Sequence, residues 1–526
     1  MSAQQVLIAG RWRPSQATGT FRADNPTTKE PLPDEYPISS WQECDEALNA
    51  AVAAAAELRK LPGEKIAEFL EAFATRLEAR KDELVAMAHA ETGLPKAPRL
   101  ADVEFVRTTG QLRQGAAAAG EGSWALPTID TKANIRSVLG PIGPVLVFGP
   151  NNFPFGFNSA AGGDFTAAIA SGNPVIAKAN SSHPGTTRLF AEEAEAAARQ
   201  VGLPAATVQL IYRTGHADGE RLVSDPRVGA TGYTGSRNAG LKLKAAADAA
   251  GKAIYLELSS VNPVVVLPGA LEERLEEVAT EFTGSCLMGA GQFCTNPGFV
   301  ILFKGGKTDA FIKTIVEKFR GAPVGTLLSK SVEKTLTEAV ATLTRAGAEI
   351  LVGGKAGGGQ GYSFGNTLLL VSGEHFLRNH AALQTEAFGN SSLLVVADDL
   401  AQACKIVDHV EGSLTGSVYS HRAGADDAAY AEIAFHLRPL VGRLLNDKMP
   451  TGVAVSPAMN HGGPYPSTGH PGFTAVGIPA SLRRFAMLQS FDAVRPARLP
   501  ALLQDKNPTG KTWRLIDLEW TTRSLG

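Results

Sequence analysis

Residues 175–212, VIAKANSSHPGTTRLFAEEAEAAARQVGLPAATVQLIY, hold two short apolar runs separated by one alanine-rich segment. The runs at 175–177 and 208–212 are rich in β-branched and apolar residues, as buried strands are. The segment 186–201 between them has the composition of a helix. A crossover of this length connects parallel strands rather than antiparallel ones. The stretch therefore predicts one βαβ unit of a parallel sheet.

Similar runs occur on both sides of this unit. They lie at 138–139, 145–148, 228–230 and 254–256, and most are separated by helical segments. Earlier in the chain, apolar residues recur at helical spacing over 40–80, which we interpret as a helical hairpin, and over 102–119. The alternation predicts a doubly wound parallel sheet that binds a ligand, with a dinucleotide as the first expectation, at the carboxyl ends of its strands.

A second α/β block follows. Strands are expected at 299–302, 368–371 and 393–396, with helices at 271–283 and 309–319. The glycine-rich stretch 353–361 lacks a phosphate-binding GxxxxGK[ST] pattern and is expected to be a surface loop. The chain therefore has at least two α/β domains.

The composition favours small-molecule chemistry. The 526-residue chain carries 50 basic and 52 acidic residues, so its charge of −2 points to neither nucleic acid nor an anionic membrane as partner. Its first ten residues lack the regions of a signal peptide, and no apolar run has membrane-spanning length. Four scattered cysteines without a CxxC pair argue against disulfides and zinc, so we expect no bound metal and a reducing, cytoplasmic location.

One cysteine stands in an unusual setting. Residues 289–298, GAGQFCTNPG, place Cys294 among Gly, Thr, Asn and Pro, which favour loops and close backbone approach. Such a frame can present a thiolate nucleophile. Local sequence leaves a packed, inert cysteine as the more common alternative, because free cysteine is among the most buried residue types. Cys286 has no such frame and is interpreted as a packing residue.

Five motifs, in this order, resemble the aldehyde dehydrogenase superfamily along nearly the whole chain. They are FGPNNFP (148–154), VIAK (175–178), LEL (256–258), GQFC (291–294) and EAFG (386–389). The stretches KANSSHP (178–184), FCTNPG (293–298) and HGGPYP (461–466) resemble the branch of 2,5-dioxopentanoate (α-ketoglutarate semialdehyde) dehydrogenases and related NADP-linked bacterial fatty-aldehyde enzymes. The resemblance implies an α/β fold with a Rossmann-type cofactor domain, an α/β catalytic domain and a small oligomerisation arm.

The resemblance also implies a catalytic set of Cys294, Glu257 and Asn152. Cys294 would attack the aldehyde carbonyl, and the Asn152 amide and the Cys294 backbone N–H would stabilise the oxyanion. After hydride transfer to a nicotinamide, a partly desolvated Glu257 would activate the water that hydrolyses the thioester. Glu257 could also deprotonate Cys294 through a water, without a neighbouring histidine. His461, in a glycine-rich turn, is interpreted as shaping the mouth of the substrate tunnel.

The cofactor site is expected at the strand ends, although the GxGxxG fingerprint is absent. Lys178 ends a strand where its ammonium can reach a ribose or phosphate, and Gly235 and Ser236 can open a helix whose N-terminus receives a pyrophosphate. On local sequence alone, a solvated surface charge is the more common alternative for Lys178. Gly-Ser is equally an ordinary turn.

Departures from the family pattern decide the expected cofactor. Many members carry a glutamate three residues after the lysine, where this chain has Ser181, a hydroxyl that tolerates a 2′-phosphate. With Lys178 and Arg213 as phosphate ligands, we expect NADP as the preferred cofactor, with NAD possible. By resemblance, Glu386 bonds the nicotinamide ribose hydroxyls rather than being an exposed loop carboxylate, and Phe388 of the same motif belongs to the cofactor site.

The expected substrate is a small aldehyde, 2,5-dioxopentanoate, oxidised to 2-oxoglutarate. Its carboxylate requires a cation, and Arg107 on the 102–119 helix is the candidate, with a surface arginine as the alternative. Phe153, Phe157 and Tyr465 are expected to form apolar walls. A tunnel without the cation would favour a long-chain fatty aldehyde.

The resemblance divides the chain into three parts. We expect a cofactor-binding domain of 1–120, 139–265 and 461–484, a catalytic domain of 266–460, and an oligomerisation arm of 121–138 and 485–526. The arm implies a homo-oligomer, either a dimer or a tetramer. A CoA-acylating enzyme and a catalytically silent protein on the same fold are two competing functions, and the presence of Glu257 together with Cys294 disfavours both.

Overall fold

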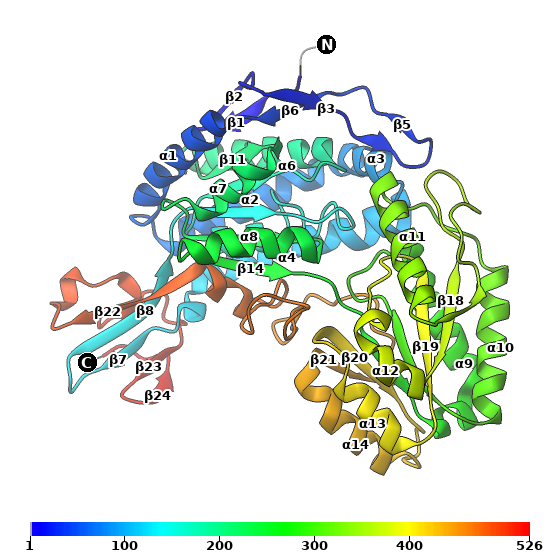
Figure 1. Ribbon diagram of the computed structural model, residues 1–526. Helices are drawn as coiled ribbons and strands as arrows, with labels where there is room; N and C mark the ends of the chain where they lie inside the picture. Colours follow the sequence, from blue (N-terminus) through cyan, green and yellow to red (C-terminus); the bar gives the residue numbers. More distant parts are fainter. Residues whose placement is uncertain (1–2, 526) are drawn as a thin grey trace.

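The computed structural model describes residues 3–525, and its first sheet contains the predicted parallel strands except the run at 138–139 (Figure 1). That run lies in a separate five-stranded sheet, where its strand pairs antiparallel with both neighbours. The order of the seven strands of the first sheet is β14 (Ala253–Glu257), β13 (Ala230–Thr234), β9 (Val145–Phe148), β10 (Val175–Lys178), β11 (Val208–Ile211), β1 (Val6–Ile8) and β2 (Arg11–Arg13). The first five are parallel, whereas β1 pairs antiparallel with β11. The intervening helices are α5 (Gly163–Ala170), α6 (Pro184–Val201), α7 (His216–Ser224) and α8 (Arg237–Ala249).

Helices from the first quarter of the chain pack on this sheet or on the helices beside it. They are α1 (Trp41–Leu58), α2 (Gly63–Ala79), α3 (Lys81–Thr92) and α4 (Phe105–Glu121), and a π-helical stretch, Lys96–Glu104, precedes α4. The predicted hairpin of the first two helices is wrong. α1 packs on β1 and β10, whereas α2 packs against α4 and α6, because the apolar faces of the two helices meet different layers.

The second sheet also has seven strands. Their order is β17 (Glu349–Val352), β18 (Thr367–Ser372), β19 (Ser391–Ala397), β16 (Phe299–Phe303), β15 (Pro263–Val266), β20 (Ser413–Tyr419) and β21 (Val441–Asn446). All pairs are parallel except β17 with β18. Its helices are α9 (Pro268–Leu287), α10 (Gly306–Gly321), α11 (Lys330–Arg345), α12 (Gly373–Leu383), α13 (Leu400–Asp408) and α14 (Asp427–Leu437).

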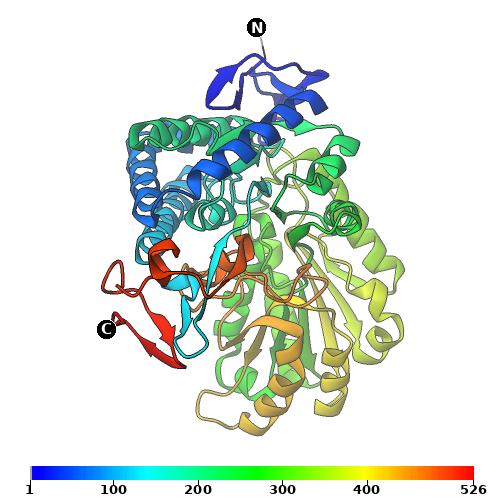
Figure 2. The ribbon, with the colours of Figure 1, turned by 90° about the vertical axis from the view of Figure 1, so that its left-hand side faces the viewer.

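The five-stranded sheet projects from the first sheet (Figures 1 and 2). Its strands, in order, are β22 (Ala486–Asp492), β8 (Ile135–Pro141), β7 (Thr128–Asp130), β23 (Arg514–Ile516) and β24 (Glu519–Thr521). The first part of the oligomerisation arm was predicted to end at residue 138, and β8 extends three residues beyond it. The cofactor-binding domain was predicted to end at residue 265, and β15 of the second sheet begins before that residue. Across residues 3–525, every helix is too short or too polar to span a bilayer.

The fold brings the two large sheets together at one point of the chain. β14 of the first sheet ends at Glu257, and β15 of the second begins at Pro263. The segment after β21 returns between the two sheets (Figure 1), where Thr468 forms a β-bridge with Glu257. Side chains from both sheets and from this segment can therefore meet at the end of β14.

Candidate active site

Cys294 lies in a tight loop between α9 and β16. Residues 289–291 all have positive φ, so the chain turns sharply after α9. A Cβ on Gly291 would lie 2.1 Å from the carbonyl oxygen of Gly389, so only glycine fits there. On the other side, the Asn262 amide donates to the carbonyl oxygen of Cys294 at 2.8 Å. The small residues around Cys294 thus hold the sulfur in a rigid loop beside the 386–389 motif.

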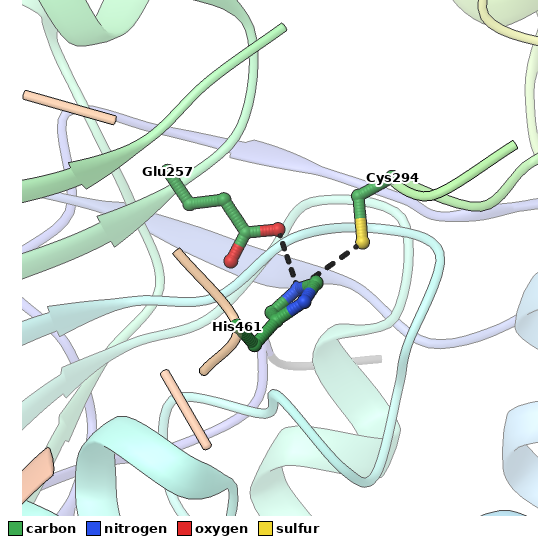
Figure 3. A group of neighbouring side chains, drawn as sticks. All are labelled: Glu257, Cys294 and His461. Carbon is green, nitrogen blue, oxygen red and sulfur yellow. Dashed lines mark hydrogen bonds and ion pairs between the residues drawn. The ribbon is translucent and has the colours of Figure 1, made fainter. Parts of the chain in front are cut away.

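Glu257 and His461 come from distant parts of the chain and meet beside Cys294 (Figure 3). Nε2 of His461 lies 2.9 Å from Oε1 of Glu257 and 3.3 Å from Sγ of Cys294. Glu257 and His461 are each only 1% exposed. Oε2 of Glu257 is buried and has no hydrogen-bond partner among residues 3–525. The three side chains form a buried chain of contacts from thiol to carboxylate.

The position of His461 corrects the interpretation from the sequence, which placed it at a tunnel mouth and gave Cys294 no histidine neighbour. A Cβ on Gly462 would lie 2.0 Å from the carbonyl oxygen of Phe473, so the turn packs closely against the chain. The His461 N–H also donates to Thr474 Oγ1 at 3.0 Å. These contacts direct the imidazole inward. One feature of the sequence could have indicated this position. His461 stands beside glycine and proline residues, as Cys294 does.

The surroundings of Cys294 favour the neutral thiol. Burial, followed by the negative charge of Glu257, raises the pKa of Cys294 well above its ordinary value, and Arg107 opposes this rise. A thiolate therefore does not form readily at neutral pH unless a group accepts the proton. His461 is a base within hydrogen-bonding reach of the sulfur.

Asn152 forms a hydrogen bond with the loop that carries Cys294. Its Nδ2 donates to the carbonyl oxygen of Gln292, two residues before Cys294, at 3.0 Å. The side chain is buried, with 6% of its surface exposed. Because an amide nitrogen carries two hydrogens, this bond leaves one hydrogen of Asn152 for another acceptor. Asn152 is thus near enough to the loop to serve as the predicted oxyanion donor.

An ion pair between half-buried Arg99 and buried Glu104, which the sequence did not indicate, fixes the Asn152 loop. Oε1 of Glu104 accepts from the backbone N–H groups of Phe155 (2.8 Å) and Gly156 (3.0 Å). Arg99 lies 2.9 Å from Glu104 and donates to the carbonyl oxygen of Asn152 at 3.0 Å. No sequence motif singled out these residues, because their partners lie about fifty residues away.

Aromatic side chains line the site. The ring centroid of Phe153 is 5.2 Å from that of Phe157 and 5.4 Å from that of Phe293, and Phe157 lies 5.5 Å from the His461 ring. The predicted wall residue Tyr465 is not part of this group: its side chain is 64% exposed. Its backbone packs against Gly412, and this contact leaves the ring on the surface.

Arg107 belongs to the same wall. Its guanidinium carbon lies 4.9 Å from the centroid of Phe157 and 5.8 Å from that of Phe153. Its Nη1 donates to the carbonyl oxygen of Val453 at 3.0 Å. The alternative of a surface arginine is therefore wrong, and a role in substrate binding stays a prediction.

Two cations lie near each other beyond the carboxyl ends of β10 and β11, Lys178 at the end of β10 and Arg213 shortly after β11. Lys178 ends β10, and burial, followed by the charge of Arg213, lowers the pKa of its ammonium to about 8. The ammonium donates to the carbonyl oxygen of Ala179 at 3.3 Å. Ser181 follows three residues later and is half-buried. Lys178 is thus not the solvated surface charge that local sequence left open.

The remaining predicted cofactor residues lie on two sides of the site. Ser236 caps α8 by accepting from the N–H of Ala239, so Gly235 and Ser236 do open a helix. Burial raises the pKa of Glu386 to about 7, and its Oε1 accepts from the N–H of Ser260 at 3.3 Å. Glu386 and Phe388 line one small cavity with Ser260. Glu386 is therefore not an exposed loop carboxylate.

Two groups of side chains within residues 3–525 have donor atoms close enough to share a metal ion. Glu257, Cys294 and His461 form one, and Cys404, Glu432 and His436 form the other. In each group the donor atoms lie within 4.8 Å of one another. The expectation of a chain without bound metal stays a prediction.

Known proteins resemble this chain over most of its length. Residues 12–435 match the aldehyde dehydrogenase family. The "Alpha-ketoglutaric semialdehyde dehydrogenase 2" of Azospirillum brasilense is 36% identical over 518 residues, which cover 95% of this chain and 97% of that protein. The "Alpha-ketoglutaric semialdehyde dehydrogenase" of Acinetobacter baylyi is 34% identical over 515 residues, 95% of each chain. The crystal structure of lactaldehyde dehydrogenase from Escherichia coli shares the fold, with a TM-score of 0.79 at 24% identity over 93% of this chain and 99% of that one.

Proposed function

Because this chain belongs to the aldehyde dehydrogenase family of oxidoreductases, we propose that it oxidises an aldehyde to a carboxylic acid through a covalent intermediate on Cys294. The observation that carries the proposal is the buried contact chain from Cys294 through His461 to Glu257. It supplies a nucleophile, a base within reach, and a carboxylate that balances the charge of the base once the base is protonated.

In the first step, His461 activates the thiol. Nε2 must be unprotonated to accept the thiol hydrogen, so the neutral ring carries its proton on Nδ1. Once protonated, the Nε2–H donates to the carboxylate of Glu257, 2.9 Å away. The thiolate of Cys294 therefore forms beside an imidazolium rather than beside an uncompensated carboxylate.

The thiolate then attacks the aldehyde carbon, and the carbonyl oxygen becomes an oxyanion. The free hydrogen of Asn152 Nδ2 and the backbone N–H of Cys294 are the donors for this oxygen. Arg99 and Glu104 hold the loop that carries Asn152, so the donor is in place before the substrate arrives. Bonds that exist before the reaction need not be formed during it.

Lys178, Ser181 and Arg213, near the carboxyl ends of β10 and β11, would hold a nicotinamide cofactor, which would supply the hydride acceptor when bound. Lys178 and Arg213 lie close enough for their positive charges to repel, which favours an anionic group between them. Ser181 provides no negative charge that would repel a phosphate. We therefore infer NADP as the preferred cofactor, with NAD as the second. Glu386 would accept the ribose hydroxyls.

Glu257 releases the product. Its Oε2 is the atom without a hydrogen-bond partner among residues 3–525, and it can take the proton of a water that attacks the thioester. The water oxygen bonds to the acyl carbon, the C–S bond breaks, and Cys294 leaves as the thiolate. A deacylating carboxylate at this position supports release of the free acid rather than transfer to CoA.

The two bacterial relatives support 2,5-dioxopentanoate, the α-ketoglutarate semialdehyde, as the substrate and 2-oxoglutarate as the product. Neither relative is named for a long-chain aldehyde. Phe153 and Phe157 would contact the methylene groups between the aldehyde and the α-keto acid.

A homo-oligomer is the proposed state of assembly. The five-stranded sheet exposes large apolar side chains, among them Leu488 (65% exposed), Trp520 (50%) and Met487 (49%). Exposed apolar surface on a projecting sheet favours pairing with a second copy of the chain. Light scattering during size-exclusion chromatography would show a dimer or tetramer, and a monomer would contradict the proposal.

Turnover of an aldehyde panel tests the proposed function. The panel contains 2,5-dioxopentanoate, succinate semialdehyde, pentanal and a long alkyl aldehyde, each with NAD or NADP and with or without CoA. Reduced cofactor is followed at roughly 340 nm. We expect CoA-independent turnover of 2,5-dioxopentanoate with NADP, lost in Cys294→Ser. Preference for the long aldehyde would contradict the proposed substrate. Dependence on CoA would contradict hydrolysis as the release step, and no turnover would contradict the proposed activity.

A further inference from the structure

We propose that Arg107 is a carboxylate-binding residue, so that the site accepts aldehydes that carry a carboxylate at the opposite end of the molecule. This inference rests on the proposed oxidation at Cys294 and names the residue that selects its substrate class. It follows from a comparison of three arginines near the nucleophile, Arg99, Arg107 and Arg443.

Arg99 is electrically balanced by the protein. Its Nη1 lies 2.9 Å from the carboxylate of Glu104, and Nη2 donates to the carbonyl oxygen of Asn152. The guanidinium also stacks over Phe153, 4.3 Å from the ring centroid. Because its charge is paired with Glu104, Arg99 does not need an anionic ligand.

Arg443 forms hydrogen bonds with the segment that follows β21 and stabilises it. Its Nη2 donates to the carbonyl oxygens of Pro450 (2.9 Å) and Gly452 (3.2 Å), and Nη1 also donates to Gly452 (3.3 Å). Both terminal nitrogens are therefore used within the protein. Only Nε of Arg443 is buried without a partner among residues 3–525.

Arg107 differs from both. Its one hydrogen bond within residues 3–525 joins Nη1 to the carbonyl oxygen of Val453, and both Nε and Nη2 are buried without a partner in that part of the chain. Burial lowers the pKa of the guanidinium, and nearby Glu104 and Cys294 partly oppose this effect. Glu104, however, is engaged by Arg99 and two backbone N–H groups. A buried guanidinium without a hydrogen-bonded anion costs free energy in the unliganded protein.

The two unpartnered nitrogens of Arg107 define the ligand. Nε–H and Nη2–H point the same way along one edge of the guanidinium, and this pair binds both oxygens of a carboxylate. Gly156 leaves space beside the Nε side of the Arg107 guanidinium. A side chain at this position would crowd it, because a Cβ would lie only 3.3 Å from Cδ and Nε of Arg107. Phe153 and Phe157 cover the guanidinium and exclude water, which strengthens a charge-assisted bond.

The substrate class follows from the two ends of the site. The aldehyde meets Cys294, the carboxylate meets Arg107, and a short apolar chain lies against the phenylalanine rings between them. A dicarboxylate of similar length, such as glutarate, offers the carboxylate without an aldehyde. Glutarate should therefore bind the free enzyme and compete with the aldehyde.

Two variants and one control test the proposal. Arg107→Met removes the charge and keeps the length and packing of the side chain, and Arg107→Lys keeps a charge but removes the paired N–H groups. Arg113→Met is the matched control, because Arg113 lies on the same helix, α4, and pairs with Glu78 at the surface. The measurements are KM and kcat for 2,5-dioxopentanoate and for pentanal, and glutarate binding by calorimetry.

We expect Arg107→Met to raise KM for 2,5-dioxopentanoate about a hundredfold, with a smaller rise for Arg107→Lys, and to abolish glutarate binding. Pentanal turnover and the Arg113→Met enzyme should change less than about threefold. Equal losses for both aldehydes, or unchanged glutarate binding, would overturn the role of Arg107. If the parent enzyme oxidises no aldehyde, the proposed function fails, while glutarate binding still decides whether Arg107 binds a carboxylate.

Discussion

Replacing His461 with glutamine tests the histidine as the base that activates Cys294. Glutamine can occupy a similar volume and can donate a hydrogen bond to Glu257. It cannot accept the thiol proton and carry it as a cation. The substitution therefore removes proton transfer while retaining a polar contact in the buried site.

The structure sets the expected size of the effect. Burial and Glu257 already raise the pKa of Cys294, so without an imidazolium only the charge of Arg107 offsets the buried carboxylate beside the thiolate. A positioned base contributes roughly a hundredfold or more to such a step, which corresponds to about 2.7 kcal/mol at about 1.36 kcal/mol per tenfold. We expect a fall of this size both in kcat and in the rate of Cys294 alkylation.

Alkylation by iodoacetamide across a range of pH, read by peptide mass spectrometry, measures thiolate formation without substrate or cofactor. In His461→Gln, Cys294 should react more slowly near neutral pH and regain reactivity only at higher pH. His470→Gln is the matched control, because His470 is exposed and lies in the same segment. An unchanged pH profile in His461→Gln would refute the base role. Equal slowing in both variants would assign the effect to the segment rather than to the imidazole.

Three further outcomes follow from the structure. The Lys178 ammonium has a pKa of about 8 and is charged below it, so NADP should bind more weakly as the pH rises through that value. Calorimetry measures this binding, and Lys178→Met should abolish its pH dependence. Glu104→Gln should lower kcat with KM little changed, because Glu104 positions the loop that carries Asn152. The surface variant Glu78→Gln is the control, and equal effects of the two variants would contradict this role of Glu104. Gly291→Ala should destabilise the fold by about 2 kcal/mol or more in denaturant titration, because the new Cβ would meet Gly389 and the backbone has positive φ. An unchanged midpoint would show that the loop can relax.

The parallel sheets could be predicted from the sequence because their strands are buried on both faces and read as continuous apolar runs. The runs at 145–148 and 175–177 became β9 and β10 within one residue. The strands β1 and β2, at one side of the first sheet, have only three residues each, too few to establish a period, and were not predicted. The helical hairpin was wrong because periodicity identifies an apolar face but not the element that covers it.

The site residues that could be predicted from the sequence are those that stand in local motifs. Cys294 and Glu257 each stand in a recognisable stretch, and the structure places them together. His461 lies 204 residues from Glu257 and 167 from Cys294, and no local pattern encodes contacts over such separations. Arg99 and Glu104 were missed for the same reason, whereas Tyr465 was assigned to a wall that its turn does not reach.

In the proposed reaction, the aldehyde becomes a thioester on Cys294 that Glu257 helps to hydrolyse. The most direct measurement is the intact mass of Glu257→Gln after mixing with 2,5-dioxopentanoate and NADP. We expect an added mass equal to the aldehyde less two hydrogen atoms, located on the peptide that contains Cys294, together with one equivalent of reduced cofactor. Reduced cofactor without an adduct, or an adduct on another residue, would contradict the proposed reaction.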